Sequence, residues 1–193
     1  MSLFSTKDLE VKEEPILRAA ATDDDSTESF VQVKCQADID LITGRIKDFN
    51  TVHYCTGGAF SAHELLFSIL RMTGPAKVYI STWTMTEYPA RLLSEALSSG
   101  KITELYCLLD VRMEKNPSVH QLIQHNSTMI RLSQCHAKVM IIENDGLSIS
   151  IISSQNMTEN PRIEAGVIST NRSVMLFHRG WILKEIENGN AFE

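Results

Sequence analysis

Hydrophobic residues along this chain of 193 residues recur in two alternating patterns, one typical of strands and one typical of helices. Short runs rich in Val, Ile, Tyr and Leu predict strands over residues 30–36, 51–55, 76–83 and 104–110. Apolar residues at helical spacing predict helices between and after them, over residues 62–72, 90–100 and 118–126. Because crossover helices connect parallel strands, this alternation predicts parallel pairing among the early strands.

The last third of the chain shows a different pattern, in which strands follow one another without helices. Two runs rich in Ile flank residues 144–146, and residues 163–170 return to an extended pattern after Pro161. Strands joined by such short turns form antiparallel hairpins. Residues 172–188 predict an amphipathic helix. We therefore expect an α/β fold, with a mixed β-sheet flanked by helices on both faces.

The first 29 residues differ in charge from the rest of the chain. They hold three Lys or Arg and eight Asp or Glu, out of 18 and 24 in the whole sequence. This composition predicts an acidic flexible arm over residues 1–29, followed by a single domain over residues 30–193. The remaining residues are nearly neutral, so they lack the strongly basic balance of many nucleic-acid-binding proteins.

The sequence shows no segment that would direct the chain into or across a membrane. No apolar run approaches the ~20 residues of a membrane-spanning helix, and the start lacks the basic region and apolar core of a signal peptide. The four cysteines are widely spaced without a C-x-x-C pair, which favours reduced thiols over disulfides or zinc. We expect a cytoplasmic protein without a metal or another cofactor.

Residues 136–164 hold the main candidate for a functional site. If residues 144–146 form a three-residue hairpin loop, with the glycine in the left-handed conformation, His136 lies opposite Ser154. Side chains on a strand alternate between its two faces, so Lys138 shares a face with His136, and Asn156 shares one with Ser154. These four polar residues would then project from one face of the sheet.

A second turn brings a carboxylate to the same place. Centring that turn on Asn160 puts Glu164 opposite Asn156. The prediction depends on the register of both hairpins, because a shift of one residue would move side chains to the other face.

These residues resemble the HKD motif of the phospholipase D superfamily, in which H-x-K is followed by G-S-x-N or S-S-x-N on a neighbouring strand. Here the two parts run from His136 to Lys138 and from Ser153 to Asn156. The resemblance implies a phospholipase D-like fold over the single domain, with one motif in each chain.

The chain departs from the family pattern at two positions and matches it at a third. Glu143 stands where the family usually has an aspartate, a position generally interpreted as structural. Ser153 replaces the more usual glycine, and Glu164 matches the glutamate that follows the motif in single-motif nucleases of the family.

The resemblance implies a phosphodiester hydrolase that needs no metal. His136 would attack phosphorus and form a phosphohistidine, because a neutral imidazole is a nucleophile near neutral pH. Lys138, Ser154 and Asn156 would bind the phosphate and stabilise charge on its non-bridging oxygens. Glu164 would accept a hydrogen bond from the second nitrogen of the imidazole, as a triad carboxylate does.

The chain has no second H-x-K sequence. One histidine cannot be both nucleophile and acid in the same half-reaction, so the second copy has to come from another chain. An isologous interface places identical surfaces face to face, and single-motif members of the family are similar in using such a dimer. We therefore expect a homodimer, with nucleic acid as its substrate and no membrane partner. The alternative is a catalytically silent dimeric binding or scaffold module in a nucleic-acid-processing assembly.

Two other features lie at predicted strand ends, where α/β proteins often bind ligands. Thr56, Gly57 and Gly58 precede a helix, and we favour a tight turn there over a phosphate site. Trp83 and Tyr88 could stack on a base, although partial burial of both is the commoner outcome.

Overall fold

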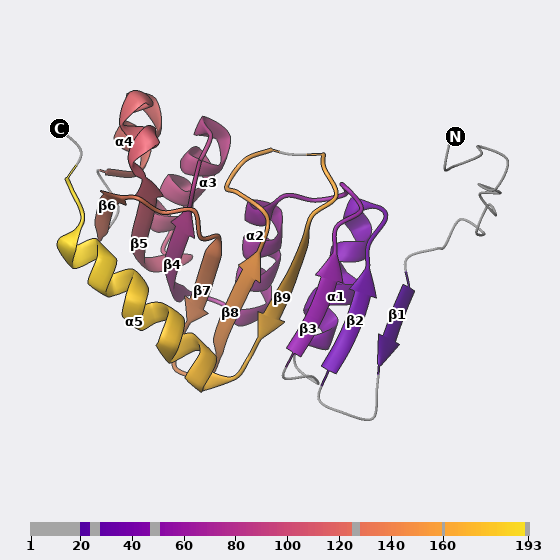
Figure 1. Ribbon diagram of the computed structural model, residues 1–193. Coiled ribbons are helices and arrows are strands. Elements are labelled where there is room, and N and C mark those ends of the chain that lie inside the picture. The colour runs from indigo at the N-terminus through magenta and orange to yellow at the C-terminus, as the bar shows by residue number, and fades with distance from the viewer. Residues whose placement is uncertain (1–19, 24–27, 47–50, 125–127, 160, 192–193) are drawn as a thin grey trace, which may run out of the picture.

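A computed structural model describes residues 20–23, 28–46, 51–124, 128–159 and 161–191 of the chain (Figure 1). The strands are β1 Ala20–Asp23, β2 Glu28–Gln32, β3 Thr51–Cys55, β4 Ala76–Thr82, β5 Ile102–Asp110, β6 Met129–Ser133, β7 Val139–Glu143, β8 Ser148–Ser153 and β9 Ala165–Ser169. The α-helices are α1 Ile39–Arg45, α2 Ala62–Thr73, α3 Glu87–Ser98, α4 Pro117–Gln124 and α5 Arg172–Asn188. Two short 3-10 helices are η2 Gln36–Asp38 and η3 Val111–Lys115.

Within these residues, nine strands form one sheet in the order β1-β2-β3-β9-β8-β7-β4-β5-β6. The pairs β2–β3, β4–β5 and β5–β6 run parallel, each connected by a helix. The other five neighbouring pairs run antiparallel. The sheet is therefore mixed, as predicted, with its later hairpins at the centre.

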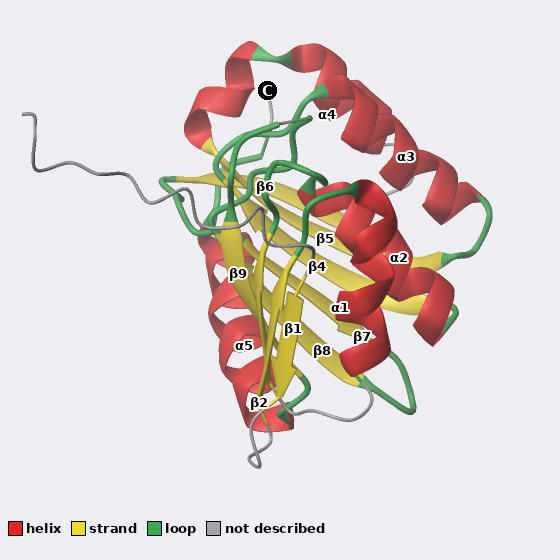
Figure 2. Ribbon diagram, turned by 90° about the vertical axis from the view of Figure 1, so that its right-hand side faces the viewer, coloured by secondary structure: helices red, strands yellow, loops and turns green. Residues whose placement is uncertain are grey.

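Helices cover both faces of the sheet (Figure 2). The first four α-helices pack on one face and contribute Ile42, Leu66, Leu93 and Ile123 to the larger core cluster. On the other face α5 packs alone and contributes Met175, Ile182 and Ile186 to a second cluster. The predicted α/β architecture with helices on both faces is confirmed. None of the helices in the described ranges combines the length and apolar character needed to cross a bilayer.

The boundaries of α2 illustrate how local sequence fixes these elements. The backbone N–H of Ser61 donates to the Glu64 carboxylate at 2.7 Å, which satisfies a donor at the start of the helix. The helix ends at Thr73. Gly74 follows it with a φ of 76°, which is favourable for glycine, and its N–H donates to the carbonyl of Leu70.

The sequence analysis predicted neither α1 nor β1. The strand β1 lies inside the segment predicted as an acidic arm and pairs with β2. The sheet therefore begins at Ala20, before the predicted domain boundary. Residues 1–19 lie outside the described ranges.

The predicted hairpin register between β7 and β8 is wrong by one residue. Glu143 pairs with Ser148, so the loop has four residues in place of three. The side-chain oxygen of Asn144 accepts from the N–H groups of Gly146 and Leu147 at 3.0 and 2.9 Å, which stabilises the longer turn. The φ of Gly146 is not positive, contrary to the prediction.

The predicted register between β8 and β9 is also shifted by one residue. Ser153 pairs with Gly166, which removes the predicted pairing of Asn156 with Glu164. The chain after β8 forms a long loop that crosses to β4, where Met157 makes an isolated parallel bridge with Met85. The predicted turn centre, Asn160, lies outside the described residues.

Candidate active site

The five predicted site residues lie beside strand ends along one side of the sheet. This side, which is called the sheet edge below, is the upper one in Figure 1. The strands β3, β4, β5 and β8 end at this edge, and β7 and β9 begin there. His136 and Lys138 precede β7, Ser154 and Asn156 follow β8, and Glu164 precedes β9. Ligand sites of α/β proteins commonly lie at the carboxyl ends of strands.

None of these five residues belongs to a strand in the described structure. The predicted reason for their convergence, alternation along two paired strands, is therefore wrong. They converge because the strand ends that precede or follow them lie side by side, and specific contacts hold the intervening loops.

Lys138 lies directly against His136. Its ammonium nitrogen is 3.2 Å from Nδ1 and 3.4 Å from Nε2 of the imidazole, and it donates to the carbonyl oxygen of His136 at 2.7 Å. The imidazole also contacts Trp83, with ring centroids 5.4 Å apart. His136 is exposed, so an incoming group can reach the ring from solvent.

Buried groups at the ends of β4 and β5 hold the backbone on both sides of His136. The carboxylate of Asp110 accepts from the N–H of Cys135 at 3.2 Å. The hydroxyl of Ser81 donates to the carbonyl of Ala137 at 3.2 Å. Both Asp110 and Ser81 are buried, at 7% and 1% exposure, and hydrogen bonds in such surroundings are stronger than in water. The position of the imidazole is therefore set by the sheet, although the residue itself lies in a loop.

The groups around Lys138 shift its pKa in opposite directions. Partial burial lowers the pKa of Lys138, while the Cys135 thiol and the Glu164 carboxylate act to raise it. Glu164 is therefore close enough to Lys138 for their charges to interact.

Glu164 is bound to Ser154. The hydroxyl of Ser154 donates to the Glu164 carboxylate and accepts from the N–H of Ala165 at 3.1 Å. The backbone of Glu164 is fixed by Thr56, whose hydroxyl accepts from its N–H at 3.0 Å and whose own N–H donates to its carbonyl at 2.8 Å.

Asn156 is connected to the end of β4. Its side-chain oxygen lies 3.4 Å from the hydroxyl of Thr82, which also accepts from the N–H of Met157 at 3.2 Å. Thr82 is next to Trp83, the residue that contacts His136. The structure thus brings Asn156 to the same strand end as the histidine, through residues that the sequence analysis had not connected with it.

Gln155 anchors the loop between Ser154 and Asn156. The hydroxyl of Tyr54 donates to its side-chain oxygen at 3.1 Å, and its amide nitrogen donates to the carbonyl of Phe60 at 3.0 Å. Burial raises the pKa of Tyr54, so its hydroxyl stays protonated. The sequence analysis did not identify Gln155 as an anchor of the loop, because its partners are distant in the sequence and only the structure shows them.

Glu143 lies at the opposite end of β7 from the candidate site. Both of its carboxylate oxygens accept from Nη1 of Arg179 in α5, at 2.6 and 2.8 Å, and this hydrogen bond raises the pKa of Arg179. The acidic residue at this position therefore joins the sheet to its covering helix, which agrees with the structural interpretation made from the sequence.

The glycines after β3 form a tight turn. The φ angles of Gly57 and Gly58 are 55° and 77°, and a Cβ at Gly57 would lie 2.4 Å from the carbonyl oxygen of Val33. The N–H of Gly58 donates to the hydroxyl of Thr56 at 3.1 Å. This geometry favours the turn over a phosphate site.

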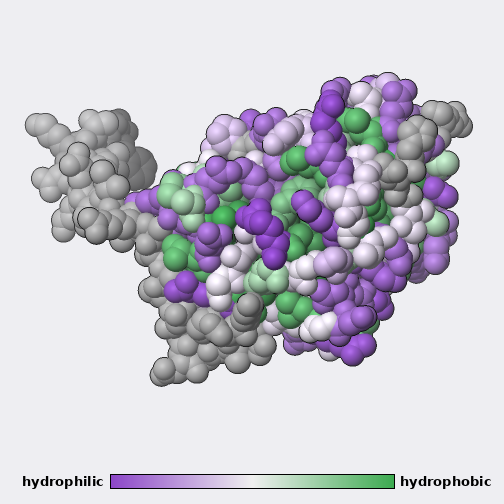
Figure 3. All heavy atoms as spheres, turned by 180° about the vertical axis from the view of Figure 1, so that it is seen from behind, coloured by the Kyte–Doolittle hydropathy of each residue, from purple (hydrophilic) through white to green (hydrophobic). Residues whose placement is uncertain are grey.

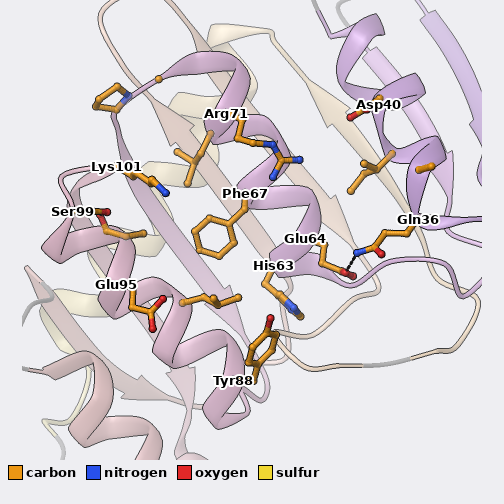
Figure 4. A pocket seen from close by; sticks show the side chains of 17 residues that line it. Gln36, Asp40, His63, Glu64, Phe67, Arg71, Tyr88, Glu95, Ser99 and Lys101 are labelled. Atoms are coloured by element: carbon orange, nitrogen blue, oxygen red, sulfur yellow. Dashed lines mark hydrogen bonds between the residues drawn. The ribbon is translucent and has the colours of Figure 1, made fainter.

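A cavity of about 1020 Å³ lies away from these residues, between α1, α2 and α3 (Figure 4). Tyr88 lines this cavity, and its ring meets the buried ring of His63 edge-on at 5.5 Å. The predicted site residues do not line it.

Figure 3 shows the molecule from behind, where apolar and polar residues are mixed over the surface. Among the residues described, no three His, Cys, Asp or Glu side chains are grouped as metal ligands.

No family model matches this sequence, and no curated protein matches it either. Solved structures do match. Nuc from Salmonella typhimurium, a phospholipase D family member, has a TM-score of 0.53 and 16% identity over 72% of this chain and 95% of its own. NucT from Helicobacter pylori has a TM-score of 0.55 and 16% identity over 74% of this chain and 99% of its own. Polyphosphate kinase from Porphyromonas gingivalis has a TM-score of 0.52 and 14% identity, with 73% of this chain covering 26% of the kinase.

These likenesses concern the fold, since their sequence identity is low. Almost the whole of Nuc and of NucT is matched by about three quarters of this chain. The fold expected from the HKD-like residues is thus found by comparison of structures as well. This chain has the fold of the phospholipase D superfamily.

Proposed function

We propose that this protein is a metal-independent phosphodiester hydrolase that acts as a nuclease. The observation that carries the proposal is the contact of the Lys138 ammonium with an exposed His136 imidazole, at a sheet edge where Ser154, Asn156 and Glu164 also gather. The structural likeness to Nuc and NucT, nucleases of the phospholipase D family, supports the same class of reaction.

In the first half-reaction, a neutral nitrogen of His136 attacks phosphorus. The bond from phosphorus to the leaving oxygen breaks, and a second imidazole donates a proton to that oxygen. In the second half-reaction a water molecule gives its proton to the same imidazole and attacks phosphorus, which releases His136. The water oxygen and one proton stay on the product phosphate ester.

Charge on the non-bridging oxygens is stabilised by fixed donors. Lys138 supplies a cation next to the attacking nitrogen, and Asn156 supplies amide donors while its oxygen faces Thr82. In this structure the Ser154 hydroxyl donates its single proton to Glu164, so in this proposal it turns to donate to the phosphate when substrate binds, and Glu164 neutralises part of the local positive charge.

The second imidazole comes from another copy of the chain. We infer a homodimer in which the sheet edges that carry His136 face each other across a two-fold axis. The exposure of His136 on an open edge suits this arrangement, because the nucleophile of one subunit then lies within reach of the acid of the other.

Hydrolysis of DNA, RNA and a bis-aryl phosphodiester, each in excess EDTA, tests the chemistry. We expect His136→Ala to abolish hydrolysis and to prevent trapping of a phosphoenzyme. His178→Ala is the matched control, since His178 lies within α5 and its imidazole accepts from the indole N–H of Trp181 in the same helix. Equal rates for wild type and His136→Ala would refute the proposal.

The dimer has a separate test. Light scattering should give twice the mass of one chain at micromolar concentration. A protein that is monomeric under the conditions of full activity would contradict the shared site.

The second candidate function is a silent dimeric binding module in a nucleic-acid-processing assembly. One observation favours it: the matched structures share the fold at only 16% identity, and a shared fold does not imply a shared activity. Oligonucleotide binding without hydrolysis, by wild type and His136→Ala alike, would support this alternative.

A further inference from the structure

Arg112 is an exposed cation held in a defined position beside the candidate active site. It lies in η3, directly after β5, and its side chain is 72% exposed. Its backbone N–H donates to Oδ1 of Asp110 at 3.1 Å, and its Nε lies 3.7 Å from the same oxygen. Its guanidinium carbon lies 5.1 Å from the centre of the Trp83 ring. These contacts restrict a side chain that would otherwise move freely in solvent.

Arg112, Trp83 and His136 form a row along the sheet edge. The Trp83 ring contacts the imidazole at 5.4 Å and the guanidinium at 5.1 Å, so the guanidinium is no farther from the imidazole than the sum of these distances. Trp83 is half-buried, which fits a supporting role better than that of an open platform for a base. Of the two roles considered for Trp83, these contacts favour support of the Arg112 side chain over stacking on a base.

The row is also tied together beneath its surface. One oxygen of the buried Asp110 carboxylate accepts from Arg112, and the other accepts from Cys135, the residue before His136. The positions of the guanidinium and of the imidazole are therefore set by a common group.

A polynucleotide differs from an isolated phosphodiester in having neighbouring phosphates. Along one strand a phosphate recurs about every 3.4 Å of helix axis, so a strand with one phosphate at His136 carries others within the length of this row. Arginine suits such a phosphate because its planar guanidinium donates two parallel hydrogen bonds to it.

We propose that Arg112, supported by Trp83 and Asp110, binds a phosphate neighbouring the scissile one, and so makes the site selective for polynucleotides over small phosphodiesters. This inference rests on the proposed function of the His136 site. It assigns to Arg112 a role in choosing the substrate, separate from the reacting atoms.

The first test compares selectivity, defined as kcat/KM for an oligonucleotide divided by kcat/KM for a bis-aryl phosphodiester. Arg112→Gln should lower this ratio at least about tenfold, since a hydrogen bond to a charged group is lost. Arg172→Gln is the matched control, because Arg172 is exposed at the start of α5, at the opposite sheet edge. An unchanged ratio in Arg112→Gln would overturn the inference while leaving the hydrolase proposal intact.

The second test needs no turnover. Binding of a labelled oligonucleotide to the full chain is measured by anisotropy over a range of salt concentrations, in a His136→Ala background. Adding Arg112→Gln should weaken binding and reduce the slope of log K against log salt by about 1. An unchanged slope, or no binding even at low salt, would overturn the inference. If wild type hydrolyses neither substrate, the hydrolase proposal fails and the binding slope alone decides the role of Arg112.

Discussion

Gly166→Ala is expected to destabilise the protein through close contacts with two side chains. The φ of Gly166 is not positive, so its backbone accepts alanine, and at such a position the substitution normally stabilises by about 0.4–1 kcal/mol. Here the new Cβ would lie 2.6 Å from Cζ and Oη of Tyr54 and 2.8 Å from Cβ of Ser153. Overpacking of this kind costs about 1–3 kcal/mol. The two effects together give a net loss of about 1–2 kcal/mol, which lowers Tm by about 2–8 °C in a chain of this size.

The same change should reach the candidate active site. Displacing the Tyr54 ring disturbs its hydrogen bond to Gln155, which lies between Ser154 and Asn156. We therefore expect the rate of phosphodiester hydrolysis to fall more than the loss of folded protein accounts for. Urea unfolding followed by circular dichroism gives the stability, and initial rates at a temperature where both proteins are folded give the activity.

A double-mutant cycle identifies the contact. Tyr54→Ala alone should cost about 3–5 kcal/mol, because a buried aromatic ring is removed. In that background Gly166→Ala should cost about 1–2 kcal/mol less than in wild type, since only the Ser153 contact remains. Gly180→Ala in α5 is the control, with nothing within 4 Å of the new Cβ and an expected gain of about 0.5–1 kcal/mol. Equal costs of Gly166→Ala in both backgrounds would refute the steric explanation.

Three further outcomes follow from the charges and buried polar groups of the structure. Burial lowers the pKa of Lys138, so Lys138 loses its proton below about pH 10.4, the usual pKa of lysine, and the rate of hydrolysis should begin to fall below that pH. Between the lowered pKa and the usual one, the unfolded chain binds more protons than the folded chain. The contribution of Lys138 to the free energy of unfolding therefore becomes more favourable as pH rises through this window. A pH–rate profile that stays flat up to about pH 10.4 would contradict a role for the Lys138 cation. Glu143→Gln should destabilise by about 1.5–3 kcal/mol in urea unfolding, as the charged hydrogen bond to the half-buried Arg179 is lost, and no effect would mean that solvent compensates fully. Ser150→Ala should raise Tm slightly, because the buried Ser150 hydroxyl has no hydrogen-bond partner within the described part of the chain, and a lower Tm would indicate that the hydroxyl is satisfied.

Several strands and helices with clear hydrophobic patterns were predictable from the sequence. The strand over residues 51–55 and the helix over residues 172–188 have the predicted boundaries, and the helix predicted over residues 62–72 ends one residue later. These segments bury a regular subset of their side chains, so local pattern and tertiary packing agree. By contrast, α1 has only seven residues, and it includes Gly44, which weakens its helical signal.

The site residues could be recognised by type, but their arrangement could not be derived. The sequence analysis used strand alternation and two turns, and both registers proved to be shifted by one residue. The loops are instead held by buried partners that lie far away in sequence, such as Asp110 for Cys135 and Tyr54 for Gln155. A single sequence contains no local signal for such pairs, because each residue taken alone resembles an ordinary member of the core.

The carboxylate of Asp110 has a consequence for how this protein can change during evolution. One of its oxygens holds the residue before His136 and the other holds Arg112, so under the proposed function a substitution at Asp110 is expected to alter reaction rate and substrate preference together. Substitutions that change only the exposed guanidinium of Arg112 are expected to alter substrate preference alone. A new substrate preference should therefore arise more readily by substitutions among residues 111–115, which follow β5, than by a substitution at Asp110, where β5 ends.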